Sequence, residues 1–319
     1  MNKRIEIIEI LQCIAVLLVV LGHSIETPPS NIHFFHLLHD FIYSFHMPLF
    51  MLISGYLFYN DTKKRTYLQF IKHKVKRLLQ PYFILSTIVF LPRIFLNEYN
   101  VNKIYLSIDG YIHQLIYPWD NVITQFWFLP TLFLIFIIAP IIKVNKKIFF
   151  CILLIAFYLH IYSYNCDIKI LNINGICFYL FYFIMGAVIC LYKDILVRCF
   201  KKNQRELLVI IMLSNILFLS NILDGIYFKI LLTFCNSILA CVFAKIYIEK
   251  KYKFLDFCKG YSYHIYLLSW LPLKVIVIIF YKIASITTAW LYVLEFFASV
   301  LIPLKLKNVI EILFTEKYR

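Results

Sequence analysis

Residues 7–25 of the chain read IIEILQCIAVLLVVLGHSI, and this stretch decides the class of the fold. An α-helix needs about 20 predominantly apolar residues to cross the hydrocarbon core of a bilayer, and the stretch has that length. Glu6 directly precedes it, Glu9 and Gln12 interrupt it, and no small-residue cleavage site follows. We therefore expect a retained membrane span rather than a cleaved signal peptide.

The composition of the whole chain agrees with this interpretation. Of the 319 residues, 62% are hydrophobic and only 15% are charged, whereas soluble domains carry about 25% charged residues. Too few polar side chains are present to cover a water-facing surface, which argues against a soluble domain, a disordered chain or a small disulfide scaffold. The nine cysteines mostly lie in apolar runs, where we expect them to act as small packing residues.

Further apolar segments follow the first one, separated by short charged stretches. We predict an all-α polytopic membrane bundle of about ten transmembrane helices, forming a single domain over residues 1–319. The nine later segments cover residues 34–59, 78–96, 125–142, 148–164, 176–192, 207–223, 227–247, 261–281 and 286–304.

The distribution of basic residues predicts the orientation of the spans. The net charge is +15, but the lysines and arginines form short clusters between apolar segments rather than a nucleic-acid-binding surface. If the N-terminus lies in the cytoplasm, most of the lysines and arginines also lie on the cytoplasmic side. They include those of the loop that we expect over residues 60–77. We predict cytoplasmic termini, contact with membrane lipid and no nucleic-acid partner.

Polar residues on the first span lie on one helical face. At 100° per residue, Glu9, Gln12 and His23 project within about 60° of one another. His23 lies about 16 Å along the axis from Gln12 and about 21 Å from Glu9. A direct contact between Glu9 and His23 is therefore excluded on a continuous helix, and Glu9 could orient or tune His23 only through intermediate groups. Since polar residues inside a membrane are costly, we favour a functional role for His23 over simple packing.

A second polar stripe runs along residues 34–59 and carries His36, His39 and His46. These histidines either form hydrogen bonds to a neighbouring helix or line a polar chamber together with the first stripe. Pro48 lacks an amide proton, so it should free the carbonyl of Ser44 and kink the helix. The histidines spiral around the helix without an evident set of acidic partners, and we expect no metal site.

Histidine suits proton transfer near neutral pH, because its ordinary pKa of about 6.5 lets it accept and return a proton. The basic run over residues 72–77 has two interpretations. It could hold the phosphates of a nucleotide-type cosubstrate, or it could only set the topology and contact anionic lipid headgroups.

Three motifs follow one another along the chain. The first is the run from Glu9 to Ala15 that leads to Gly22-His23-Ser24, and the second is Phe45-His46-Met47-Pro48 followed by Ser54-Gly55-Tyr56. The third is the basic run with Lys74 and Arg77 that leads to Pro81-Tyr82. In this order they resemble the motifs of the acyltransferase-3 family of bacterial membrane acyltransferases. Weaker matches to the family occur at Trp127–Leu129, Phe183–Gly186 and Tyr261–Leu268.

The resemblance implies a ten-helix enzyme of the bacterial cytoplasmic membrane that takes an acyl group from acyl-CoA. By position, His23 is the implied catalytic residue, and His46 lies in the second motif. Lys74, Arg77 and Gln12 occupy positions implied to bind the donor. The chain departs from the family pattern in three places. Glu9 replaces an aspartate and Gln12 replaces a basic residue, and Ser269 and Trp270 follow the Tyr-Leu-Leu run that the family often ends with a histidine.

We therefore expect an O-acyltransferase that uses acetyl-CoA and acts on a sugar hydroxyl of a surface glycan or its lipid-linked precursor. His23 is the expected general base, and His46 would position the substrate or stabilise the oxyanion. The alternative is a protein without enzymatic activity that transports a glycan or serves as a scaffold in its assembly.

Overall fold

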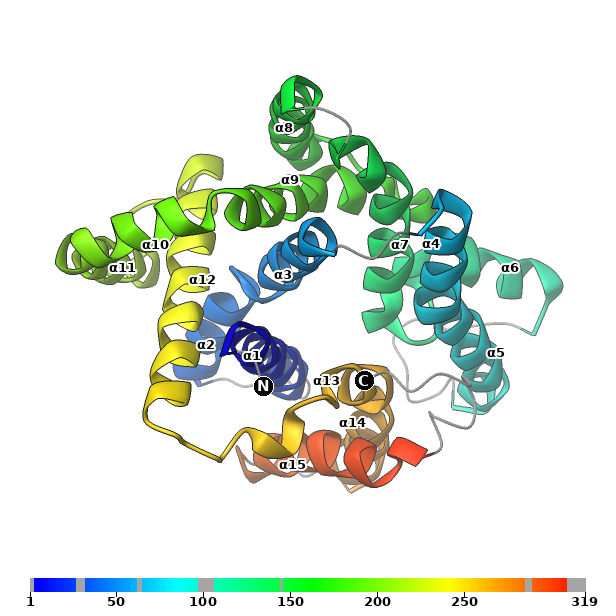
Figure 1. Cartoon of the computed structure of the whole chain (residues 1–319). Helices are drawn as coiled ribbons and strands as arrows, with labels where there is room; N and C mark the ends of the chain where they lie inside the picture. Colours follow the sequence, from blue (N-terminus) through cyan, green and yellow to red (C-terminus); the bar gives the residue numbers. More distant parts are fainter. Residues whose placement is uncertain are drawn as a thin grey trace. The chain divides into compact units, whose positions relative to one another are not determined.

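The computed structural model describes residues 3–26, 32–61, 65–96, 106–143, 146–284 and 289–308, and within these ranges it is helical and contains no strand (Figure 1). Helical runs long and apolar enough to cross a membrane occur eight times in the described part of the chain. The prediction of an all-α polytopic membrane protein is confirmed. The eight runs are Glu6–Glu26, His33–Asn60, Tyr67–Phe95, Thr124–Lys143, Ile148–Asn165, Ile170–Leu191, Ile226–Glu249 and Ser262–Ile283.

Two of the ten expected spans are shorter helices. They correspond to α11 (Gln204–Leu219), with 16 residues, and α15 (Ala289–Lys305), with 17 residues. At a rise of 1.5 Å per residue each is about 25 Å long, near the lower limit for crossing a bilayer. The count of ten spans and the cytoplasmic location of the termini stay predictions.

The contacts divide the chain into two compact units. Unit 1 comprises residues 1–57 and 186–319, and unit 2 comprises residues 58–185. In unit 1, α1 (Lys3–Glu26) lies among α2 (His33–Tyr43), α12 (Ile226–Glu249), α13 (Ser262–Leu268) and α15, as Figure 1 shows. The other described helices of unit 1 are α3 (His46–Asn60, up to Leu57), α10 (Lys193–Lys202), α11, α14 (Trp270–Ile276) and the π-helix η9 (Val277–Ile283).

Unit 2 contains α4 (Tyr67–Lys74), the π-helix η1 (Val75–Leu79) and α5 (Gln80–Phe95), which follow one another without a break. The helix α7 (Phe128–Ile138) contacts α4 and η1. The remaining described helices of this unit are α6 (Ile108–Ile116), α8 (Lys146–Tyr162), most of α9 (Ile173–Leu191) and the short 3₁₀ turns at Pro118–Asp120, Thr124–Trp127, Ala139–Lys143, Ser163–Asn165 and Ile170–Asn172.

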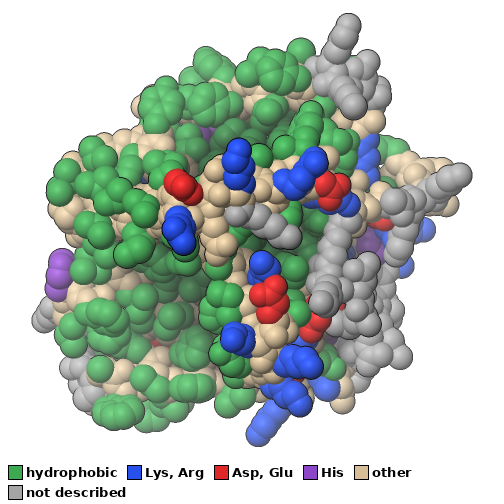
Figure 2. Space-filling model, turned by 60° about the vertical axis from the view of Figure 1, so that its left-hand side comes forward, with side chains coloured by type: hydrophobic (Ala, Val, Ile, Leu, Met, Phe, Trp, Pro, Cys, Tyr) green, Lys and Arg blue, Asp and Glu red, His purple; other side chains and the backbone are tan. Residues whose placement is uncertain are grey.

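Large apolar side chains on the surface fit a lipid environment. On α11, Met212 and Ile216 are 64% and 56% exposed, and Figure 2 shows hydrophobic side chains over much of the face that it displays. Such extended apolar surface is unusual for a soluble monomer. Lysine, arginine and acidic side chains gather in one part of this face, as expected where helices leave the hydrocarbon region.

The segment predicted at residues 34–59 is two helices rather than one kinked helix. The first, α2, ends at Tyr43, and α3 begins at His46. As expected for a carbonyl four residues before a proline, the Ser44 oxygen lies outside the helical ladder. The Thr233 hydroxyl of α12 shares its proton between this oxygen and the Lys229 carbonyl oxygen of its own helix, each at 2.8 Å. The amide nitrogen of Asn236, one turn along α12, lies 3.4 Å from the Ser44 hydroxyl. Side chains of α12 thus form hydrogen bonds with the polar groups of Ser44 at the break between α2 and α3.

We expect Thr233→Val to lower the free energy of unfolding by about 1 kcal/mol, because it leaves the Ser44 carbonyl without its donor while keeping the side-chain shape. SDS titration of the purified protein in mixed micelles measures this change. Ser237→Ala on the same helix is the matched control, since its hydroxyl donates only to the carbonyl of Thr233 within α12. Equal effects of the two substitutions would contradict the role assigned to Thr233.

The prediction that residues up to Arg77 form a loop before a helix at residue 78 is wrong. The helix begins at Tyr67, because Thr66 forms a capping box with Gln69. The Thr66 hydroxyl accepts from the Gln69 amide at 3.3 Å, and the Gln69 side chain accepts from the Thr66 amide at 3.1 Å. Lys74 and Arg77 therefore lie inside a continuous helical run.

Candidate functional site

A polar cluster lies where the last turn of α1 meets the end of α2, in unit 1. His23 and Glu26 are one turn apart on α1, and the His23 Nδ1 lies 3.0 Å from the Glu26 Oε2. The Tyr43 hydroxyl, from α2, donates to the same carboxylate oxygen at 3.3 Å and lies 3.4 Å from the His23 Nδ1. Two polar groups from two helices, the Glu26 carboxylate and the Tyr43 hydroxyl, thus converge on the Nδ1 atom of His23.

Two more histidines surround Tyr43. The His39 ring stacks on the Tyr43 ring with a centroid distance of 4.0 Å, and the His46 ring meets it edge-on at 4.8 Å. His46 is 4% exposed, and its Nδ1 lies 2.8 Å from the carbonyl oxygen of Ile42. Because a carbonyl can only accept, Nδ1 of His46 carries the proton and Nε2 keeps its lone pair.

Close contact between α1 and α2 depends on a glycine. A Cβ added at Gly22 would lie 2.9 Å from the Cε2 atom of Tyr43, closer than carbon atoms normally approach. The absence of a side chain at Gly22 therefore lets the tyrosine ring lie against α1 beside His23. The local break after Tyr43 then turns His46 towards the same ring.

The structure brings together two of the predicted site residues, His23 and His46, through Tyr43. Glu9 and Gln12 lie half-buried on the continuous helix α1, about 21 Å and 16 Å along the axis from His23. A Glu9–His23 contact is thus excluded, as the sequence predicted. The carboxylate beside His23 is Glu26, which the sequence analysis missed even though its spacing of three residues is a known signal for neighbouring side chains. No spacing rule identified Tyr43, because it lies on another helix.

Lys74 and Arg77 belong to unit 2. The Lys74 ammonium lies 3.6 Å from the ring centroid of Phe136 on α7 and 5.3 Å from that of Phe70, so aromatic faces stabilise its charge. Arg77 lies half-buried in η1. These residues can supply positive charge to an anionic ligand, and their binding of the acyl donor stays a prediction.

No group of three metal-ligating side chains occurs in the described part of the chain. His33 and His36 are exposed on α2, and His39 is stacked on Tyr43. The cluster therefore offers acid–base groups and aromatic surfaces rather than a set of metal ligands.

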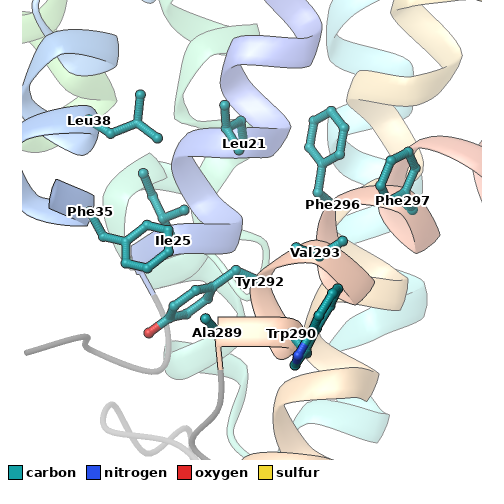
Figure 3. A pocket seen from close by; sticks show the side chains of 10 residues that line it. All are labelled: Leu21, Ile25, Phe35, Leu38, Ala289, Trp290, Tyr292, Val293, Phe296 and Phe297. Carbon is teal, nitrogen blue, oxygen red and sulfur yellow. The ribbon is translucent and has the colours of Figure 1, made fainter. Parts of the chain in front are cut away.

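A separate apolar pocket of about 320 Å³ lies between α1, α2 and α15 (Figure 3). Leu21 and Ile25 of α1 line it, together with Phe35 and Leu38 of α2 and six residues of α15, namely Ala289, Trp290, Tyr292, Val293, Phe296 and Phe297. His23 is two residues from Leu21 and two from Ile25. At 100° per residue, its side chain is therefore rotated by about 200° around the helix axis from each of them. The pocket and the histidine cluster thus lie on different faces of α1.

Residues 5–306 match the model of a family described as an acyltransferase domain (Acyl_transf_3). The chain belongs to the acyltransferase-3 family. The resemblance seen in the three sequence motifs is thereby confirmed, and the acyltransferase-3 chain is a multi-pass membrane acyltransferase. No curated protein and no solved structure matches it.

Proposed function

We propose that this acyltransferase-3 protein transfers an acetyl group from acetyl-CoA to a sugar hydroxyl of a surface polysaccharide or its lipid-linked precursor. The proposed location is the bacterial cytoplasmic membrane. The observation that carries the proposal is the environment of His23, whose Nδ1 faces a carboxylate while its side chain stays 28% exposed. A histidine in this arrangement can act as a general base towards a substrate on its open side.

In the proposed reaction, the Nε2 atom of His23 takes the proton of the sugar hydroxyl as the hydroxyl oxygen bonds to the thioester carbonyl carbon. The resulting tetrahedral intermediate then collapses with cleavage of the carbon–sulfur bond. The imidazolium returns its proton to the leaving sulfur, which departs as the thiol. A base is needed because a neutral hydroxyl is a weak nucleophile.

The other predicted residues have roles in the same scheme. His46 positions the acceptor or stabilises the oxyanion, since it lies beside Tyr43 in the cluster. Lys74 and Arg77 bind phosphates of the donor, and Gln12 is a further proposed donor-binding residue. Glu9 acts on His23 only through intermediate groups on the face that they share.

The test is transfer of radiolabelled acetyl from acetyl-CoA into the glycan fraction of membranes from the source cells. Membranes that contain the chain should label the glycan, and otherwise identical membranes from which the chain has been deleted should not. Other acyl-CoA donors in parallel reactions identify the transferred group. If membranes that contain the chain move the glycan across but do not label it, the proposal is overturned and a transport function is favoured.

A further inference from the structure

We propose that Glu26 and Tyr43 are positioning residues of His23. They hold the proton on Nδ1 and leave the Nε2 lone pair for the acceptor hydroxyl. This inference rests on the proposed function of His23 as the general base, and it adds two residues that neither the motifs nor the family match assigns.

The direction of each hydrogen bond supports the assignment. An ionised carboxylate can only accept, and the Glu26 Oε2 lies 3.0 Å from Nδ1 of His23. The Tyr43 hydroxyl donates its proton to Glu26, so towards His23 it presents only oxygen lone pairs, at 3.4 Å. Both neighbours of Nδ1 are then acceptors, and a neutral imidazole that faces two acceptors carries its single proton there. The other ring nitrogen, Nε2, is left as the base.

The position of Glu26 argues against a role in helix stability. It is the last residue of α1, and the C-terminal end of a helix carries partial negative charge that disfavours a carboxylate. The Glu26 side chain is also 53% exposed, and an exposed ion pair by itself adds little to stability. If Glu26 orients His23, this function explains why a carboxylate occurs at the C-terminal end of α1, where the helix dipole disfavours it.

Tyr43 supplies the rigidity that an exposed pair lacks. Its ring lies between the rings of His39 and His46 and is held close to α1 at Gly22. Its hydroxyl therefore reaches Glu26 and His23 from a fixed direction. Groups fixed in this way preserve a catalytic geometry without reorganising during the reaction.

The first experiment measures acyl transfer by the full-length protein in membranes. We expect Glu26→Ala to lower kcat by about 10–100-fold with little change in KM, because substrate binding is retained while the base loses its orientation. Glu26→Asp should restore part of the lost rate. Tyr43→Phe, which keeps the ring between the two histidines, should give a smaller loss of kcat.

Asp120→Ala is the matched control, because it removes a similar histidine–carboxylate contact in unit 2, that of the His113 Nε2 with the Asp120 Oδ2 at 3.0 Å. It should leave kcat and KM unchanged. An equal loss of kcat in Asp120→Ala would overturn the specific role of Glu26.

The second experiment does not depend on activity. In ¹⁵N-histidine-labelled protein in bilayers, with the His23 signal assigned by its loss in His23→Gln, the wild type should show the Nδ1–H tautomer. Glu26→Ala should increase the Nε2–H tautomer. An unchanged tautomer together with an unchanged kcat in Glu26→Ala would overturn the inference while leaving the base role of His23 intact. Full activity of His23→Gln would instead overturn the base role of His23 on which the inference rests.

Discussion

Replacing His23 by glutamine should lower kcat for acyl transfer by about 10²–10⁴-fold, which is the contribution typical of a general base. Glutamine keeps a side chain of similar length and can still form a hydrogen bond to Glu26 or Tyr43, but its amide cannot take a proton from a hydroxyl near neutral pH. The local packing between α1 and α2 should therefore survive, so that the loss reflects chemistry. The measurement is the initial rate of label transfer at matched protein abundance.

His113→Gln is the matched control for this substitution. His113 is also partly exposed, at 50% for its side chain, and its ring also faces a carboxylate at 3.0 Å, but it lies on α6 and has no place in the proposed reaction. Its kcat should equal that of the wild type. Retained activity of His23→Gln at wild-type abundance would remove His23 from the reaction.

Much of the helical architecture was predictable because the bilayer imposes a simple requirement on the sequence. Each span must be a long apolar helix with its backbone groups satisfied internally. The first segment, predicted at residues 7–25, is part of the continuous helix α1. The loss of the helical hydrogen bond to the Ser44 carbonyl was also predictable, since a proline four residues later has no amide proton to donate. That Thr233 would supply the replacement was not, because the two residues are 189 positions apart.

The start of the helix at Tyr67 shows where apolar patterning fails. Lysines and arginines lower the hydropathy of residues 72–77, yet the helix begins earlier, at a capping box formed by Thr66 and Gln69. Local hydrogen bonding at a helix start does not depend on hydropathy. Long basic side chains can also lie along apolar surface while their charge finds another partner, as Lys74 does on Phe136.

The candidate site was predictable only in part. His23 stood out because an ionisable group inside a membrane needs a reason to be there. His46 stood out because it shares a stripe with His39, and the structure places both against Tyr43. Tyr43 itself carried no signal, since a tyrosine in an apolar segment is ordinary. Its importance comes from the contact between α1 and α2, which the sequence does not encode in any local pattern.

Gly186→Ala should strongly destabilise the packing of α9 against α3. Gly186 of α9 lies directly against the backbone of α3, and an added Cβ would collide with the Leu52 carbonyl oxygen. It would also come within 2.8 Å of the Leu52 carbonyl carbon and 2.9 Å of the Tyr56 amide nitrogen. These are backbone atoms, so no side-chain rotation relieves the overlap. We expect a loss of about 1–3 kcal/mol in the free energy of unfolding, as for other overpacked interiors.

The control for this prediction is Gly225→Ala, which adds the same methyl group where nothing lies within 4 Å. The backbone there is extended, with φ of −177°, so alanine is tolerated without strain. SDS titration should separate the two variants, with Gly225→Ala close to the wild type. Helices in a membrane associate through close backbone approach rather than through burial of apolar area, which is why one methyl group between α9 and α3 should outweigh an added methyl group on the surface. Equal stability of the two variants would show that α9 can move away from α3 at little cost.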